Sequence, residues 1–448
     1  MTDVATSIGA AAQTPPRAVA SPHMTDAAKA RLRRRYRAEQ RFKMYGVAAI
    51  AVAVLSLVVL LGDIVWRARG ALIQTQVRLE VELDPQALGI QTAGGTPTPA
   101  EIRSGSFERV VVQALSAALP EVTNRSDRRL LQRMVSEGAG AELRNKVVAD
   151  PSLLGRTIEF WAPTRSDIDL LVKGQIDRGV PEDQRRVRDI EIQWIEKLDA
   201  QGKVRSAFNT RFFAGSNSSN PEQAGVWGAI IGSLLTLSVT AFLAVPIGVM
   251  AAIYLQEFAP KNRLTELIEV NINNLAAVPS IVFGLLGLAV LLNFMGLPRS
   301  APLVGGIVLA LMSLPVIIIA TRASLRSVPP SIREAALGIG ASKMQVVLHH
   351  VLPLAVPGIM TGTIIAMAHA LGETAPLLMI GMNAFFTDVP SGWMSSATVL
   401  PVQVFTWAED AQRGFVEKTS LAICVLLLFL LSMNAIAIYL RRKFERRW

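Results

Sequence analysis

Glu373 is the ionisable residue that most needs an explanation, because it interrupts the apolar stretch at residues 354–379. A charge near the middle of a membrane costs several kcal/mol on insertion scales unless it faces protein or water. We therefore expect Glu373 to face the interior of a helix bundle, in a structural ion pair or along a path for a polar solute. His369 lies four residues earlier on the same helical face, where a hydrogen-bonded pair can form, and Thr374 offers a hydroxyl donor.

Arg322 ends another apolar stretch, and its guanidinium matches tetrahedral oxyanions through paired hydrogen bonds. An arginine at an inner membrane boundary also snorkels and sets topology, so both roles stay open. Metal chemistry has no support, because no histidine has a metal-ligand spacing and Cys424 is the single cysteine. His369 and Glu373 are joined by no nucleophile or metal constellation, which argues against an intramembrane enzyme.

The composition is that of a membrane protein. Of the 448 residues, 51% are hydrophobic and 18% are charged, whereas a soluble protein carries about 25% charged residues. The net charge of +10 comes from 45 Lys and Arg against 35 Asp and Glu. These basic residues gather in short clusters beside apolar runs, which indicates membrane orientation and not a nucleic-acid partner.

The N-terminal part predicts a cytoplasmic tail followed by a membrane anchor. Residues 1–26 lack apolar periodicity, and eight basic residues lie between positions 29 and 43 against one acid, Glu39, so we expect residues 1–43 to form a disordered basic tail on the cytoplasmic side. Residues 44–65 are apolar and long enough for a first transmembrane helix. The long lead before this helix favours a retained signal anchor over a cleaved signal peptide.

Residues 66–225 differ in kind from the rest of the chain. They hold 22 Lys and Arg against 21 Asp and Glu, and no window could span a bilayer. We expect an inserted soluble α+β domain on the periplasmic side, ended by a polar linker at 213–223. The periodicity predicts strands over 76–83 and 157–161 and helices over 107–119 and 126–136.

Five more apolar spans follow this domain and bring the predicted total to six transmembrane helices. If the N-terminus is cytoplasmic, alternation places the C-terminus there as well, and the basic residues of the inner loops agree with that topology. The fold class is therefore membrane all-α with one inserted domain. The five spans lie near residues 226–255, 274–295, 303–320, 354–379 and 421–440.

The inner loop at residues 322–353 predicts a helical hairpin on the cytoplasmic surface. Two consecutive prolines, Pro329 and Pro330, break the preceding helix. Ser331 with Glu334 three residues later has the pattern of a capping box. The sequence therefore predicts that a short helix begins at this serine.

Ser342 with Gln345 repeats the capping pattern and predicts a second helix, which we expect Pro353 to close. Small residues on the first helix suit close docking against another protein. The alternative is a plain interfacial helix that joins two spans. The small residues are Ala335, Ala336, Gly338 and Gly340.

The same loop resembles the EAA loop of ABC-importer permeases. The shared pattern is Glu-Ala-Ala, three residues, Gly, nine residues, an aliphatic residue, one residue and Leu-Pro, and the one departure is His350 at the aliphatic position. In that family the loop is a coupling helix that sits in a cleft of the ATPase subunit. The resemblance implies this role for Ser331, Arg333, Glu334, Ala335, Ala336, Gly340, Leu352 and Pro353.

Three other stretches are similar to the PstA family of phosphate-specific transport permeases. Residues 278–287 look like its VPS-x-V-Y/F-G-L signature, residues 371–378 look like its GETAPLL box, and residues 244–249 read AVPIGV. These motifs occur in order within residues 226–448, so the resemblance implies a type I ABC-importer permease core there. It implies nothing about residues 66–225.

This resemblance implies the permease subunit of an ATP-driven importer that moves inorganic phosphate across the bacterial inner membrane by alternating access. The chain has no G-x-x-x-x-G-K-[ST] pattern, so it would not be an enzyme and would bind no cofactor, and ATP and Mg would belong to partner subunits. The implied partners are a second, homologous permease in a heterodimer, two ATPase subunits, a periplasmic phosphate-binding protein and membrane lipid.

The candidate translocation pathway includes Ser280, Arg322, His369, Glu373 and Thr374. A carboxylate repels a dianion but accepts a hydrogen bond from a protonated oxygen, which would favour hydrogen phosphate over sulfate. Glu373 would otherwise balance an arginine. Two other functions remain as alternatives: a secondary transporter, for which inverted repeats are expected, and a membrane-anchored phosphate sensor.

Overall fold

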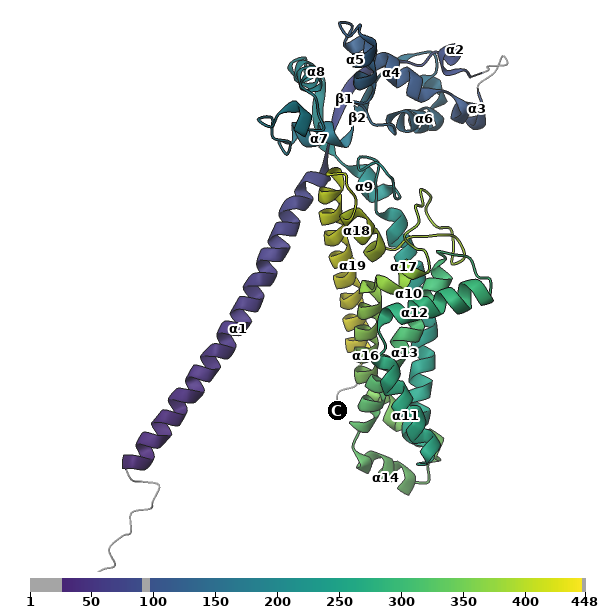
Figure 1. The fold of residues 1–448 in the computed structure, drawn as a ribbon. Helices are drawn as coiled ribbons and strands as arrows, with labels where there is room; N and C mark the ends of the chain where they lie inside the picture. The colour runs from purple at the N-terminus through teal and green to yellow at the C-terminus, as the bar shows by residue number, and fades with distance from the viewer. Residues whose placement is uncertain (1–25, 91–96, 445–448) are drawn as a thin grey trace, which may run out of the picture. The chain divides into compact units, whose positions relative to one another are not determined.

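The computed structural model describes residues 26–90 and 97–444. It divides into two compact units, residues 1–63 and residues 64–448. The larger unit contains a small β-sheet with its helices and a bundle of long apolar helices (Figure 1). The predicted combination of a helical membrane part and an α+β part is therefore present in the secondary structure.

The first described element is helix α1 (Asp26–Leu72), which is 47 residues long. The predicted first span at 44–65 lies inside it. The prediction of disorder over residues 1–43 is wrong for 26–43, which are helical, because Ala, Arg, Lys and Leu are all strong helix formers. The part of that prediction that concerns residues 1–25 lies outside the described residues.

A three-stranded antiparallel sheet forms the centre of what we call the sheet domain, residues 73–208. Its strands are β1 (Ile73–Glu82), β2 (Thr157–Pro163) and β3 (Val204–Phe208), in the order β2-β1-β3. Leu79 of β1 lies opposite Phe160 of β2. The two predicted strands are thus confirmed, and the structure pairs them with each other, while β3 was not predicted.

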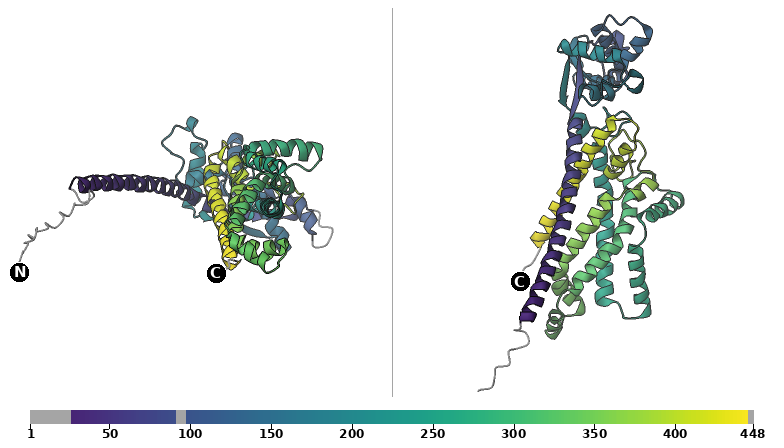
Figure 2. Two further views of the ribbon diagram at one scale, coloured as in Figure 1. Left: turned by 90° about the horizontal axis from the view of Figure 1, so that it is seen from below. Right: turned by 60° about the vertical axis from the view of Figure 1, so that its left-hand side comes forward.

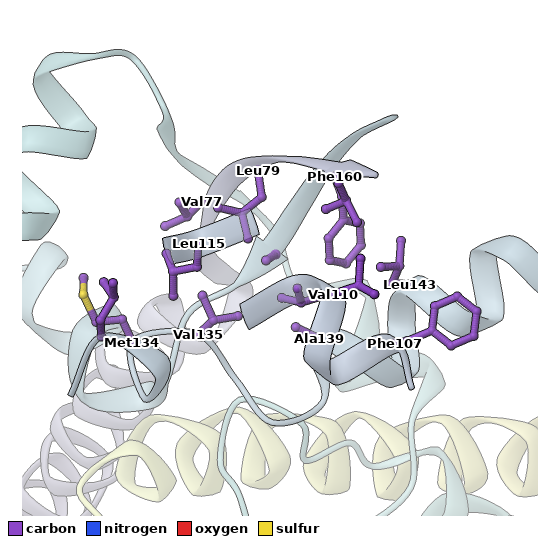
Figure 3. Packing of buried hydrophobic residues seen from close by; sticks show 14 of the residues in the cluster. Val77, Leu79, Phe107, Val110, Leu115, Met134, Val135, Ala139, Leu143 and Phe160 are labelled. Carbon is purple, nitrogen blue, oxygen red and sulfur yellow. The ribbon is translucent and has the colours of Figure 1, made fainter. Parts of the chain in front are cut away.

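Helices α4 (Phe107–Ala118) and α6 (Ala139–Ala149) both contribute several side chains to the hydrophobic core of this domain. Figure 3 shows Val110 and Leu115 of α4 and Leu143 of α6 among side chains from β1 and β2. The predicted helix at 126–136 is shorter than expected and forms α5. The remaining helices of this region are α2 (Pro85–Leu88), α3 (Pro99–Ser104), α5 (Arg125–Gln132), α7 (Ser166–Val172), α8 (Asp189–Ala200) and α9 (Thr210–Ala214), with 3-10 turns η1 (Pro151–Leu153) and η2 (Glu182–Gln184).

Four long helices of the larger unit form the bundle: α10 (Trp227–Ile253), α13 (Pro302–Arg326), α16 (Leu352–Gly372) and α19 (Gly414–Phe444). Helix α13 packs between α10 and α16, and α16 also packs against α19 (Figures 1 and 2). Within the described part of the chain, five helices including α1 are long and apolar enough to cross a membrane, or up to six if one bent pair is counted as a span.

Two of the predicted spans are not continuous helices. The span predicted near 274–295 consists of α11 (Arg263–Ala276) followed by α12 (Ser280–Leu286) and the π-helix η4 (Gly287–Phe294), and the two arms are bent by 103°. Pro279 lies at the bend and disfavours a helical conformation of the residue before it. The span predicted at 354–379 breaks in the same way between α16 and α17 (Ala375–Met379), where Pro376 lies in the first turn of α17.

Glu222 is a buried carboxyl in the loop between α9 and α10, with 6% of its surface exposed. The Ser166 backbone N–H donates a hydrogen bond to its Oε2 at 3.2 Å. Burial raises the pKa of Glu222, because leaving water penalises the charged form, and hydrogen bonds from Ser136 and Ser166 together with the nearby Arg165 oppose that effect only in part. The folded chain therefore holds this proton to higher pH than the unfolded chain.

We expect Glu222→Gln to raise the melting temperature at pH 8 by about 1–2 °C. The pKa of Glu222 is higher in the folded chain than in the unfolded chain. The native state therefore loses stability as the pH rises from the unfolded-state pKa through the folded-state pKa. Glutamine does not ionise, so the variant does not have this loss. Differential scanning fluorimetry of both chains between pH 5 and pH 8 should show the gap widening with pH. Glu182→Gln, at an exposed site of the sheet domain, is the control; a gap independent of pH would contradict the prediction.

Candidate functional site

The predicted helical hairpin is present, and we call residues 327–353 the hairpin segment. Its first helix is α14 (Pro330–Gly338), which lies at one end of the helix bundle (Figure 1). Gly340 has φ +88° and its N–H donates to the Leu337 carbonyl at 2.9 Å. Only glycine adopts this conformation without strain, so Gly340 fixes the turn that ends α14.

One of the two predicted capping boxes forms. Ser342 Oγ accepts a hydrogen bond from the Gln345 N–H at 3.4 Å, and the Gln345 side chain accepts one from the Ser342 N–H at 2.8 Å, at the start of α15 (Lys343–Gln345). The box predicted for Ser331 with Glu334 is wrong. Pro329 occupies the N-cap position and Pro330 begins the helix, so Ser331 already lies at the second helical position.

The second helix does not stop at Pro353. Helix α15 continues through the π-helix η5 (Val346–Val351) into α16, and the three form one helical run from Lys343 to Gly372. A π-turn widens the helix by one residue and relieves the clash between a proline ring and the preceding turn. Pro353 therefore lies within the first turn of α16, with Leu352 before it.

Arg333 attaches α14 to the ends of two bundle helices. Its Nη2 donates to Glu257 Oε1 at 2.8 Å and to the Leu325 carbonyl at 2.8 Å, and its Nη1 donates to the Val328 carbonyl at 2.7 Å. The side chains of Arg333 and Glu257 are 23% and 10% exposed. A planar guanidinium is suited to this combination of a carboxylate and helix-end carbonyls.

The π-helix η3 (Tyr254–Phe258), which extends α10, provides this carboxylate and two more contacts. Gln256 Oε1 accepts a hydrogen bond from Arg326 Nε at 2.8 Å. The ring of Phe258 lies 5.4 Å from the Lys343 ammonium, a cation–π contact. Three consecutive residues of η3 therefore contact the end of α13, α14 and α15, and they hold the hairpin segment to the bundle.

An apolar groove of about 730 Å³ lies between α14 and the start of α16. Ala335 and Ile339 on one side and His349, His350 and Pro353 on the other contribute to its walls. Glu334 and Ala335 are exposed. Ala336, which we expected on the exposed face, is 4% exposed and packs in the core beneath the hairpin segment, because α14 turns that side toward α13 and η5.

Arg322 forms an ion pair with Glu269, whose Oε1 lies 2.5 Å from Arg322 Nη2. The pair joins α13 to α11, and the Arg322 side chain is 11% exposed. Among the described residues, its Nε is a buried atom that lacks a hydrogen-bond partner. Arg322 thus pairs with a carboxylate through Nη2, while its buried Nε–H has no acceptor in this structure.

Glu373 lies at the break after α16, where its backbone leaves the helical region with φ −75° and ψ 125°. His369 Nε2 lies 3.1 Å from Glu373 Oε1, within the distance of the pair that the four-residue spacing allows. The Glu373 side chain is 18% exposed and that of His369 is 59% exposed. Thr374 occupies the N-cap position of α17 and is partly buried.

The structure does not bring Arg322 and Glu373 together. Gly358 and Gly362 of α16 face Ser324 and Ala320 of α13, so Arg322 lies level with the first half of α16. Glu373 lies about thirteen residues further along α16, or about 20 Å along the helix axis. Ser280 begins α12, which packs against α17 beside Glu373. The predicted pathway residues thus form two separate groups.

Sequence reasoning missed Glu257 and Glu269, the acidic partners of Arg333 and Arg322. Both lie in segments that we treated as connections, because the third span was predicted to begin only at residue 274. The signal that was available is the helical spacing of apolar residues over 263–276, which extends the element across Glu269. No local pattern marks Glu257, since its partner is 76 residues away.

Comparison with known proteins shows two matching families. The family described as "binding-protein-dependent transport system inner membrane component" matches residues 244–448. A second family, described as a domain of unknown function (DUF3333), matches residues 29–182. The methionine ABC transporter MetNI, solved in inward-facing conformations, aligns with 49% of this chain and 98% of its own at 18% identity and a TM-score of 0.41.

Three curated proteins illustrate the similarity in sequence. The phosphate transport system permease protein PstA 1 of Mycobacterium tuberculosis (strain CDC 1551 / Oshkosh) is 34% identical over 232 residues, 51% of this chain and 74% of that protein. PstA of Yersinia pestis is 34% identical over 225 residues, 48% of this chain and 72% of its own. PstC of Haemophilus influenzae is 32% identical over 235 residues, 47% and 73% of the two chains.

Proposed function

This chain belongs to the PstA family of phosphate transport system permeases, and from this premise we propose how its parts contribute to import. It is a permease subunit of a phosphate ABC transporter. It is a multi-pass protein of the inner membrane, and its family is not itself catalytic. We propose that it moves inorganic phosphate inward by alternating access, with energy from ATP hydrolysed on partner subunits.

We propose six transmembrane spans, with the bent pair α11 and α12 counted as one of them. Both termini would be cytoplasmic and the sheet domain periplasmic, because the basic residues before residue 44 and after residue 440 favour the inner side. Domain limits at 1–43, 44–65, 66–225 and 226–448 fit this arrangement, except that α1 continues to Leu72. The hairpin segment then lies on the cytoplasmic side.

The hairpin segment is proposed to couple the permease to an ATPase subunit. The observation that carries this proposal is the firm attachment of α14 through Arg333, together with the exposed Glu334 and Ala335 beside an apolar groove. An exposed short helix next to such a groove can dock in a cleft, and its attachment to η3 and α13 would transmit a movement of the ATPase to the bundle. Gly340, Leu352 and Pro353 shape the segment, whereas Ser331 contributes no cap.

The two polar groups in the bundle are proposed as successive contacts for phosphate. Glu373, with His369 and Thr374, lies at a helix break, where a carboxylate can accept a hydrogen bond from protonated phosphate. Arg322, about 20 Å further inward, offers its free Nε–H to an anion. Ser280 lies at the start of α12 near the first group. Two phosphate contacts that lie apart along the bundle suit a pathway that is open to only one side of the membrane at a time.

The partners that this function requires are proposals from the family. They are a second, homologous permease in a heterodimer, two ATPase subunits that bind ATP and Mg, and a periplasmic phosphate-binding protein. The similarity to both PstA and PstC relatives supports a permease pair. This chain itself is proposed to bind no cofactor.

Phosphate uptake by the assembled complex tests the division between coupling and translocation. We expect Glu334→Lys to abolish both uptake and co-purification of the ATPase, because it reverses a charge on the exposed face of α14. Glu373→Gln should leave co-purification intact and lower uptake about tenfold, the equivalent of one hydrogen bond to a charged group. Both are measured with radiolabelled phosphate in proteoliposomes.

Glu182→Lys, an equal charge reversal at an exposed site of the sheet domain, is the matched control and should transport at the rate of the parent. If Glu334→Lys and Glu373→Gln also transport at that rate, both assignments fail.

A further inference from the structure

An apolar layer lies where the segments that flank the sheet domain pack against the helix bundle. The last turns of α1, helix α9, the start of α10, helix α18 (Leu400–Ala408) and the start of α19 pack together there. Phe212 and Phe415 are completely buried in this layer on either side of Trp407. The layer excludes water from the polar groups beside it, which strengthens their electrostatic interactions.

Lys173 lies at the edge of this layer and connects three separate elements. Its ammonium donates to Asp169 Oδ2 of α7 at 2.5 Å, to the Gly70 carbonyl of α1 at 2.7 Å and to Glu417 Oε2 of α19 at 3.2 Å. An ammonium has three donors, and all three are used. The side chains of Lys173 and Glu417 are both 7% exposed.

The Glu417 carboxylate fills the space beside Gly70 so closely that position 70 has no room for a side chain. The Gln175 side chain donates to the other carboxylate oxygen, Oε1. A Cβ atom at position 70 would overlap this same carboxylate, whose atoms are the three nearest to it. Gly70 is therefore required for the close approach of α1 to α19, and the ion pair can form only when these helices and α7 are in this arrangement.

Lys418 adds a second cation to the cluster, and Glu222 is a third carboxyl group near it. Lys418 follows Glu417, is 7% exposed and lies 5.5 Å from the centre of the Phe212 ring. Two lysines, Lys173 and Lys418, thus accompany the carboxylates of Asp169 and Glu417. Removing one charged group of a buried ion pair leaves the opposite charge buried without a counter-charge. The loss of folding stability is then larger than the stability that the intact pair contributes. The cluster therefore resists separation of the sheet domain from α19.

We propose that Lys173 and Glu417 latch the sheet domain to α19, so that the domain, the end of α1 and the first turn of α19 move as one body during transport. This inference rests on the proposed transport function. It assigns the sheet domain a mechanical role: the domain fixes one end of α19, and the rearrangement of the bundle occurs relative to that fixed end.

Opening the latch is the first test. Lys173→Met leaves Asp169 and Glu417 without their cation, and we expect phosphate uptake by the assembled complex to fall about tenfold and the melting temperature to fall by several degrees. Lys197→Met is the matched control, because Lys197 pairs with Glu121 on the same domain at side-chain exposures of 45% and 48%. The control should change neither quantity. Uptake by Lys173→Met at the parental rate would overturn the proposal.

Closing the latch covalently is the second test. Gly70→Cys with Glu417→Cys in a Cys424→Ser chain removes the carboxylate that fills the space at position 70 and puts two thiols there. When reduced, this chain has an open latch and should transport about tenfold less than the Cys424→Ser parent. When oxidised, the disulfide replaces the ion pair and should restore uptake to within about twofold of that parent.

Two results would overturn the proposal: an oxidised chain that is blocked, since α19 would then have to move relative to α1 and the domain, or a reduced chain that transports normally. If the parent itself does not transport phosphate, the proposed function fails and not the latch. In that case the melting temperature alone tests the latch, because the oxidised chain should melt several degrees above the reduced one.

Discussion

Arg333→Ala should eliminate phosphate-dependent ATP hydrolysis and phosphate uptake by the complex while the chain still inserts and folds. The substitution removes the charged hydrogen bonds to Glu257 and the contacts to two carbonyls at the end of α13. It leaves Glu257 buried without a cation, a change that costs about 3–5 kcal/mol where a buried pair is broken. Helix α14 would then be free to move without moving the bundle.

The measurement is uptake together with ATPase rate and ATPase co-purification for each variant. Arg326→Ala is the matched control, because Arg326 contacts η3 only through the neutral Gln256, and it should lose less than about threefold in uptake. Exchange of the charges, Arg333→Glu with Glu257→Arg, should recover part of the activity. Normal coupled uptake by Arg333→Ala would show that the attachment of α14 to η3 is dispensable.

Arg322→Gln is expected to reduce uptake about 100-fold, because it removes both the ion pair with Glu269 and the free Nε–H donor. Arg322 could serve only as the ion-pair partner of Glu269, or it could also bind phosphate. These two roles predict different results for the double variant Arg322→Gln with Glu269→Gln. If the arginine only neutralises Glu269, the double variant regains uptake, since no charge is left uncompensated. If the arginine binds phosphate, the double variant regains stability but stays inactive.

We expect the second result, measured as phosphate uptake and melting temperature on the same preparations. Glu269→Gln alone is the companion measurement, and it should retain much of the uptake because Arg322 stays available. A double variant with parental uptake would remove Arg322 from the translocation pathway.

The sequence predicts elements whose cause is local. Ser342 and Gln345 form their capping box because both partners lie within one helical turn, and Gly340 ends α14 because its own backbone conformation requires glycine. The strands near 76–83 and 157–161 are predicted by the alternation of apolar and polar residues alone. Ser331 shows the limit of such patterns, because two adjacent prolines moved the helix start by their own geometry.

The contacts that hold the candidate site together have no local cause. Arg333 and Glu257 are 76 residues apart, and Lys173 and Glu417 are 244 residues apart, so only the packed fold brings them together. The break at Glu373 has a visible cause in Pro376, yet the apolar run continues through it. Hydropathy measures length and composition, and it cannot distinguish one straight helix from two pieces.

The continuous helix from Lys343 to Gly372 is 30 residues long, about 45 Å. A rotation applied where α15 meets η3 can therefore reach His369 and Glu373 through one continuous helix. The regular hydrogen bonding of this helix is interrupted at Pro357 and at η5, whose wide turn holds one residue more than an ordinary turn. If that turn became an ordinary α-helical turn, the part of the helix beyond it would rotate by about 100°, the rotation of one residue in an α-helix. His369 would then point in another direction, although no loop had changed its conformation.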